Sequence, residues 1–349
     1  METRKLGRTG LDVSVICLGT MTWGQQNDEK EGHEQMSYAL ERGINVFDTA
    51  ELYSIPPKAE TQGSTETIIG TWLAADKARR DKVVLATKIV GRSDNTWFRD
   101  PPRQARLTKT DIVEACDASL RRLQTDVIDL YQVHWPDRPV PFGANPVVYT
   151  HNDGEAVPIE ETLEALDGLV EAGKVKHIGL SNESAWGTMR YVAASEARGL
   201  ARVQSIQNAY NLVNRTYEVA LAEIAMREDV GLLAYSPLAQ GYLTGKYRGG
   251  ALPKGSRKQL FNRLARYEAP GTDAAIEAYW ALAEELGLDL GQLAIRFTTT
   301  RPFLTSSIIG ATSMEQLKHD IDAQDLAWSD EIETRINAIH QIHQNPAGS

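Results

Sequence analysis

Short apolar runs alternate with longer amphipathic segments along the whole chain. Runs such as residues 83–86 and 307–309 are continuously apolar, which is typical of parallel strands buried on both faces. The segments between them carry apolar residues at helical spacing, as in the stripe of Ile112, Cys116, Leu120 and Leu123. The strand-like runs end at Thr22, Ala50, Ile89, Trp135, Asn182, Asn211, Leu238 and Ala311. The pattern therefore predicts eight strand-then-helix units.

Eight such units favour an α/β fold of the (β/α)8 TIM-barrel type, as one domain over residues 1–349. An open doubly wound sheet is the alternative, but it should show a G-x-G-x-x-G fingerprint after an early strand, and the sequence has none. Residues 3–17 predict an extra N-terminal hairpin, and residues 329–343 a C-terminal helix. Residues after Asn345 indicate a disordered tail. Three segments exceed plain connectors and predict long loops at the C-terminal face of the barrel: 54–63, 136–158 and 239–271.

Composition narrows the class of protein. Hydrophobic residues make up 42% of the chain and charged residues 24%, as in ordinary globular proteins. The net charge of −10 disfavours nucleic acid as a partner. We also expect no membrane association, because no apolar run is long enough to span a bilayer and no signal peptide is visible. The two cysteines exclude a disulfide framework, so a cytoplasmic protein is expected.

Four polar residues stand at or just after strand-like runs. Asp48 ends the second predicted strand, Tyr53 lies five residues later, Lys88 ends the third strand and His134 follows the fourth. Each residue type occurs at strand ends for purely structural reasons as well. Because the four come from consecutive strands, alternation predicts that they meet at the mouth of the barrel.

The chemistry of these four side chains indicates proton transfer to an oxygen atom. A buried lysine needs an ionic partner, and Asp48 is the obvious one. A cation beside a phenol lowers the phenol pKa, so Lys88 would make Tyr53 a general acid near neutral pH. His134 would donate a hydrogen bond to a substrate carbonyl. No metal site is expected, because His340 and His343 stand alone near the C-terminus.

With these residues in place, the sequence resembles the aldo-keto reductase family nearly end to end, in the branch that holds bacterial Tas-type proteins and potassium-channel β-subunits. Six ordered motifs carry the resemblance: D-T-A-E-L-Y at 48–53, Lys88 after Ala-Thr, Val-His134-Trp, G-K-V-K-H-I-G-L-S-N at 173–182, Y-S-P-L at 235–238, and I-G-A-T at 309–312. The family implies a TIM barrel that uses NADPH to reduce carbonyl groups of small molecules.

The resemblance also implies a role for each matching residue. Tyr53 would be the proton donor, Lys88 and Asp48 would lower its pKa, and His134 would orient the carbonyl. Ser181, Asn182 and Gln207 would hold the nicotinamide carboxamide, and Tyr235 would stack on its ring. The pyrophosphate would meet Ser236, Pro237, Leu238, Ala239, Gln240, Gly241, Tyr242, Leu243, Thr244 and Lys246. Gly310, Thr312, Gln316 and Asp320 would line the adenosine pocket, Arg257 would meet the 2′-phosphate, and Gly19, Thr20, Met21 and Asp48 complete the expected NADP(H) contacts.

Some residues depart from the family pattern. Ser54 replaces the usual glycine, and His319 with Asp320 replaces the usual Glu-Asn. The insertion 136–158 is expected to overhang the site and to set substrate choice, and Trp23 and Trp135 are candidates to line an apolar substrate pocket. An NADP(H)-binding regulatory or partner protein with slow turnover remains the alternative function, and a barrel with unrelated chemistry is a third.

Overall fold

The computed structural model describes residues 1–143, 147–152 and 154–348. Eight parallel strands form a closed barrel in the order β10-β3-β4-β5-β6-β7-β8-β9, as the sequence predicts. Their bounds are β3 (Ile16–Gly19), β4 (Val46–Asp48), β5 (Val84–Ile89), β6 (Ile128–Val133), β7 (Val175–Ser181), β8 (Val203–Ala209), β9 (Gly231–Tyr235) and β10 (Leu304–Ile309). Within the long segment 136–158, residues 144–146 and 153 lie outside the described residues.

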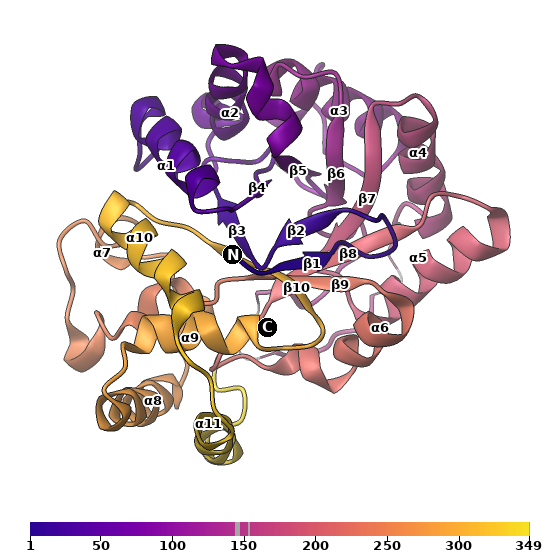
Figure 1. The fold of residues 1–349 in the computed structure, drawn as a ribbon. Coiled ribbons are helices and arrows are strands. Elements are labelled where there is room, and N and C mark those ends of the chain that lie inside the picture. The colour runs from indigo at the N-terminus through magenta and orange to yellow at the C-terminus, as the bar shows by residue number, and fades with distance from the viewer. Residues whose placement is uncertain (144–146, 153, 349) are drawn as a thin grey trace.

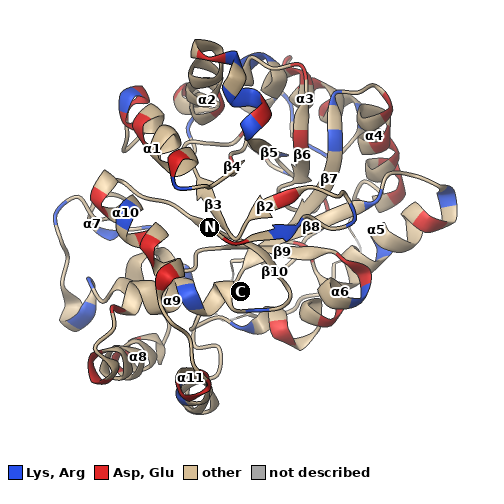
Figure 2. Cartoon of the chain, in the orientation of Figure 1, with Lys and Arg blue, Asp and Glu red and all other residues tan. Residues whose placement is uncertain are grey.

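Helices surround the barrel on its outer side (Figure 1). They are α1 (Glu29–Glu41), α2 (Ser64–Ala75), α3 (Lys109–Leu123), α4 (Ile159–Glu171), α5 (Ala185–Arg198), α6 (Leu221–Glu228), α7 (Arg257–Phe261), α8 (Thr272–Leu286), α9 (Leu290–Thr299), α10 (Met314–Asp322) and α11 (Asp330–Ile342). Several begin at a capping side chain: Thr108 accepts a hydrogen bond from the Asp111 backbone, and Ser313 accepts one from the Gln316 backbone. Acidic and basic residues are interspersed over these helices (Figure 2).

The expected N-terminal hairpin consists of β1 (Thr3–Lys5) and β2 (Asp12–Ser14). Its antiparallel pairing ends at Ser14, before the boundary expected at residue 17, because Ile16 onward pairs with β10 as the first barrel strand. Leu6 and Val13 of the hairpin pack into the cluster that fills the barrel interior. The hairpin therefore closes one end of the barrel.

Strand alternation inside the barrel places the polar residues. The interior is filled by small and medium apolar side chains, among them Val84 and Ala86 of β5 and Leu130 of β6. Two positions further along β5 the same face carries Lys88, and along β6 it carries Gln132 and then His134. The interior is therefore apolar along its length and polar at the ends of the strands.

The C-terminal tail corrects one expectation. Residues 346–348 pack against the rest of the protein rather than being disordered: Ala347 is buried, its N–H donates to the Val213 carbonyl, and the Gly348 carbonyl accepts from Asn214. Sequence alone missed this because short polar tails carry no periodic pattern. Within the described ranges, no helix combines the length and apolar character needed to cross a bilayer.

Candidate active site

Asp48, Lys88 and Tyr53 meet at the mouth of the barrel. The ammonium group of Lys88 donates to Asp48 Oδ2 at 2.6 Å and to the Thr49 carbonyl at 2.7 Å, and it lies 3.4 Å from the Tyr53 hydroxyl. Lys88 is fully buried, and Asp48 is 3% exposed. The structure thus brings together the three groups that the sequence singled out, with the cation between the carboxylate and the phenol.

Two glutamines complete the hydrogen bonding of Asp48. Gln132 of β6 and Gln207 of β8 each donate to Asp48 Oδ1, at 3.2 and 2.9 Å, and Gln207 also donates to the Gln132 side chain at 3.2 Å. Gln132 was not expected as a site residue. The sequence could have indicated it, because a glutamine on the inward face of a buried strand needs polar partners.

The pKa of Tyr53 differs from the sequence expectation. Burial of the phenol raises its pKa above the ordinary value and the charge of Asp48 adds to this, while Lys88 only partly opposes them. The pKa of Lys88 is also raised, because Asp48 and Tyr53 together outweigh the effect of burial. Tyr53 is therefore protonated at neutral pH and remains able to donate its proton.

His134 faces the same space. Its imidazole ring lies edge-on to the Tyr53 ring, with the centroids 5.7 Å apart. Burial, with a smaller effect from Lys88, holds the pKa of His134 well below its usual range. Within the described structure its buried Nδ1 atom has no hydrogen-bond partner. Because its imidazole is neutral and has an unpartnered nitrogen, His134 is suited to bind a polar atom of a ligand.

A buried ion pair supports the loop that carries Tyr53. Glu51, two residues earlier, is 1% exposed and receives two hydrogen bonds from Arg99, at 3.0 and 3.1 Å. Its carboxylate also accepts from the Val90 backbone at 2.7 Å. This pair ties the loop after β4 to the loop after β5, and no sequence pattern indicated the pairing of Glu51 with Arg99.

The expected nicotinamide residues lie next to the tetrad of Asp48, Tyr53, Lys88 and His134 and contact one another. Asn182 donates to the His134 carbonyl at 2.8 Å, and its Oδ1 accepts from the Tyr235 hydroxyl at 2.6 Å. Ser181 donates to the Gln207 carbonyl at 2.8 Å. Arg266, which the sequence did not single out, donates to the Tyr235 hydroxyl at 2.9 Å. The amide groups are therefore positioned at the mouth of the barrel by strands β6, β7, β8 and β9.

The loop after β9 has an unusual backbone. Positive φ angles occur at Ser236 (57°), Ala239 (49°), Gln240 (56°) and Gly241 (100°). The φ of 100° at Gly241 is a backbone conformation that favours glycine, and the side chain of Lys246 packs against this position. Pro237, Leu238, Tyr242, Leu243 and Thr244 belong to the same turn. Successive turns of this kind form concave groups of backbone N–H donors that suit anions.

Two cations border this loop without an ionic partner. Lys246 and Arg257 are both half-buried, and neither forms an ion pair with any residue that the structure describes. Burial lowers the pKa of Lys246. Burial and the charge of Arg263 lower the pKa of Arg257 to about 10. Burying a cation without a counter-charge is unfavourable, so the pair suits an anionic ligand.

The remaining expected contacts lie at the ends of β3 and β10. Gly19 ends β3, where a Cβ atom would lie 2.8 Å from the Ile308 side chain. Thr20 donates to the Asp48 carbonyl at 2.9 Å, and the Met21 carbonyl accepts from the Ile55 N–H. After β10, Gly310 leads to Thr312, whose hydroxyl and N–H both donate to Gln316 at 3.0 Å.

Asp320, the last of the residues expected in the adenosine pocket, lies in a charged environment. Its carboxylate is buried, and burial raises its pKa even though His319 lies 3.4 Å away. His319 also lies 3.2 Å from Asp289, and its pKa is raised, first by its hydrogen bond to Asp320. Lys246 acts on Asp320 electrostatically. The replacement of Glu-Asn therefore adds a titratable pair within electrostatic reach of Lys246.

The two candidate pocket tryptophans differ in position. Trp23 is fully buried and donates its indole N–H to Gln35, so it is a core residue rather than a pocket wall. Trp135 is half-buried, lies 4.9 Å from the His134 ring, and lines a pocket together with the insertion. Among the described residues, no group of three His, Cys, Asp or Glu side chains is arranged to hold a metal ion.

The closed barrel with this polar site at its mouth defines the class of protein. The model of the aldo/keto reductase family matches residues 15–341, and the chain belongs to this family of oxidoreductases. Its members generally use NAD(P)H and act on small carbonyl compounds.

Particular relatives cover nearly the whole chain. Protein tas of Escherichia coli is 45% identical over 348 residues, covering 99% of this chain and 100% of that protein. The uncharacterized oxidoreductase YrpG of Bacillus subtilis is 36% identical over 349 residues, covering 100% and 98%. A probable voltage-gated potassium channel subunit beta of Arabidopsis thaliana is 31% identical over 331 residues, covering 93% and 92%.

Proposed function

We propose that this protein is an NADPH-dependent reductase of aldehyde or ketone carbonyls, with Tyr53 as the general acid. One observation carries the proposal: the Tyr53 hydroxyl lies 3.4 Å from a buried lysine that is itself paired with Asp48, beside a neutral His134. This arrangement supplies a proton donor and a neutral hydrogen-bond donor to one oxygen atom, which is what a carbonyl needs as it becomes an alcohol.

Each of four side chains has its own role in proton transfer. The N–H of His134 binds the carbonyl oxygen and orients it. Tyr53 donates its proton to that oxygen as negative charge develops there, and Lys88 stabilises the phenolate that remains. Asp48 keeps Lys88 charged and in place. A reduced nicotinamide, when bound, supplies the hydride.

The residues present fit this cofactor at both of its ends. At the nicotinamide end, the buried Nδ1 of His134 has no partner among the described residues, and the amides of Asn182 and Gln207 lie close by. At the phosphate end, the positive-φ loop and Lys246, which has no ion-pair partner among the described residues, suit the pyrophosphate. We propose that Arg257 binds the 2′-phosphate, which supports NADPH as the preferred form.

The test compares wild type with Tyr53→Phe. We expect wild type to oxidise NADPH in the presence of some members of a panel of aldehydes and ketones. Tyr53→Phe should lower kcat by about 10²- to 10⁴-fold, the usual contribution of a general acid. Its NADPH affinity, followed by quenching of tryptophan fluorescence, should be unchanged, because the phenylalanine ring fills the same space. A variant with wild-type kcat would refute the assignment of Tyr53.

A second function is an NADP(H)-binding partner or regulatory protein with slow turnover. The observation in its favour is the similarity to a plant protein named as a probable potassium channel β-subunit. It predicts tight NADPH binding without turnover for wild type and Tyr53→Phe alike, so the same experiment separates the two functions. We further propose a cytoplasmic location, which the two buried, unpaired cysteines support.

A further inference from the structure

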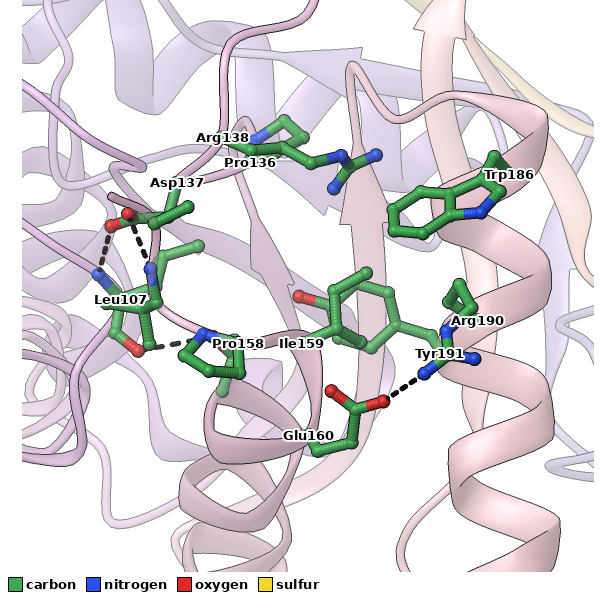
Figure 3. Close-up of a pocket in the computed structure, with 13 residues that line it drawn as sticks. Leu107, Pro136, Asp137, Arg138, Pro158, Ile159, Glu160, Trp186, Arg190 and Tyr191 are labelled. Carbon is green, nitrogen blue, oxygen red and sulfur yellow. Dashed lines mark hydrogen bonds and ion pairs between the residues drawn. The ribbon is translucent and has the colours of Figure 1, made fainter. Parts of the chain in front are cut away.

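Two cavities flank the segment that follows β6, and they differ in chemistry. The cavity between α4 and α5 has a volume of about 230 Å³ (Figure 3). Its ionisable side chains are already paired: Glu160 with Arg190, Arg138 with Glu183, and Asp137 with Arg106 and two backbone N–H groups. No charge in this cavity calls for a ligand.

The second cavity lies between the loop after β5 and the segment after β6. It has a volume of about 370 Å³ and is lined by residues 92–94, 135–140 and 142. Its wall continues a row of aromatic rings that starts at the tetrad. The ring of His134 lies 4.9 Å from Trp135, and Trp135 stacks on Phe142 with centroids 6.1 Å apart. A flat apolar body placed along this row would reach from the tetrad into the cavity.

Arg92 distinguishes this cavity from the first. One of its guanidinium nitrogens donates to the Glu155 carbonyl at 2.6 Å, and its own carbonyl accepts from the Trp135 indole at 2.9 Å. Within the described part of the chain, Arg92 has no carboxylate partner. A guanidinium offers five N–H donors in a planar fork that matches a carboxylate. Arg92 therefore keeps donors available at the edge of an apolar pocket.

The other charged residues of the cavity do not neutralise Arg92. Asp137 and Arg138 are committed to Arg106 and Glu183. Asp94 is exposed, and its carboxylate accepts from the Gln104 amide at 2.5 Å. Since Asp94 is solvated, its charge is screened, whereas Arg92 is half-buried.

We propose that Arg92 binds an anionic group of the substrate, so that the preferred substrates are elongated, flat carbonyl compounds with a carboxylate remote from the carbonyl. This inference rests on the proposed reductase function. Trp135 and Phe142 hold the apolar body, and the guanidinium of Arg92 holds the carboxylate at the far end.

The test compares two aldehydes of the same elongated shape, 4-(4-formylphenyl)benzoate and the neutral 4-(4-formylphenyl)benzamide, with the NADPH-loaded enzyme. Wild type should prefer the benzoate by about 10-fold or more in kcat/KM, the usual effect of a charge-assisted hydrogen bond. In Arg92→Gln the ratio should fall to about one through a higher KM for the benzoate, with the benzamide unaffected. Glutamine keeps a polar amide at this position but lacks the charge and the forked N–H donors of the guanidinium.

Two further variants separate charge from structure. Arg92→Lys should retain part of the preference, and Asp94→Asn, a matched change of opposite charge in the same pocket, should retain all of it. A wild-type ratio near one, or a ratio that survives in Arg92→Gln, would overturn the inference. The ratio of the two Kd values, measured by calorimetry, needs no turnover. An intact binding preference without turnover would therefore refute the proposed function and leave this inference standing.

Discussion

Lys88 at the mouth of the barrel and Arg257 at the start of α7 are both cations removed from bulk water, but their surroundings are opposite. Lys88 is fully buried and has a carboxylate, a carbonyl and a phenol as partners. Arg257 is half-buried and has no ionic partner within the described ranges. The comparison shows that Lys88, at the proposed catalytic end, already has its counter-charge within the protein, whereas Arg257, at the proposed phosphate end, has none among the described residues, as expected of a site that binds an anion.

The largest effect is expected from Lys88→Met. The change leaves Asp48 buried without its counter-charge, so the free energy of unfolding should fall by about 3–5 kcal/mol. Loss of the cation beside Tyr53 should lower kcat by roughly 10²-fold or more, because nothing then stabilises the phenolate. Urea denaturation measures the first quantity, and NADPH oxidation under stabilising conditions measures the second.

The double variant Asp48→Asn, Lys88→Met serves as the control. It removes both charges, so most of the lost stability should return while the activity stays low. If activity returned together with stability, Lys88 would act only as a structural residue, and the contrast between the two ends would fail.

A smaller effect of opposite sign is expected from Arg257→Gln. Its lowered pKa means that the folded state disfavours the charged guanidinium, so removing the charge should raise the free energy of unfolding by on the order of 1 kcal/mol without ligand. NADPH affinity should fall by about 10- to 100-fold and NADH affinity should be unchanged. Fluorescence titration with both cofactors gives the two affinities.

The variant Lys254→Gln is a matched control, because Lys254 is exposed and its loss should change neither stability nor affinity appreciably. An NADPH-to-NADH affinity ratio unchanged in Arg257→Gln would exclude a 2′-phosphate contact at this residue.

Part of the fold and of the candidate site could be predicted from the sequence. The eight strands and the convergence of Asp48, Lys88 and His134 followed from continuous apolar runs and a period of two, because these patterns are local. Tyr53 was placed correctly beside Lys88 although it lies on a loop, because it follows Asp48, the partner of Lys88, by only five residues. The direction of its pKa was missed, because desolvation depends on everything that covers the phenol.

Long-range partners were harder to predict. The pairing of Glu51 with Arg99, the contact of Arg266 with Tyr235, and the ordered tail at Ala347 join segments far apart in the chain without any shared period. Residues 239–271 illustrate the same limit. The sequence predicted a long loop there, but only the structure shows that the backbone at Gly241 has a φ of 100°, which favours glycine.

The smallest expected change concerns pH, and it probes the catalytic end alone. The pKa of His134 lies well below 6.5 and that of Tyr53 above 10, so both groups keep one protonation state across neutral pH. We expect kcat at saturating NADPH to vary by no more than about twofold between pH 6 and pH 8. Saturation removes the titration of the cofactor phosphate, whose pKa is about 6, from the measurement.

Stability should behave differently from kcat over the same range. Because the unfolded chain binds a proton at His134 near pH 6.5 while the folded protein does so only well below it, the free energy of unfolding should decrease as the pH falls through that value. In His134→Asn this part of the decrease should disappear. A wild-type kcat that instead fell with an apparent pKa near 6.5 would show that His134 is solvated and titrates freely. The contrast between the barrel mouth, whose charged groups are already partnered, and the proposed phosphate site would then be wrong.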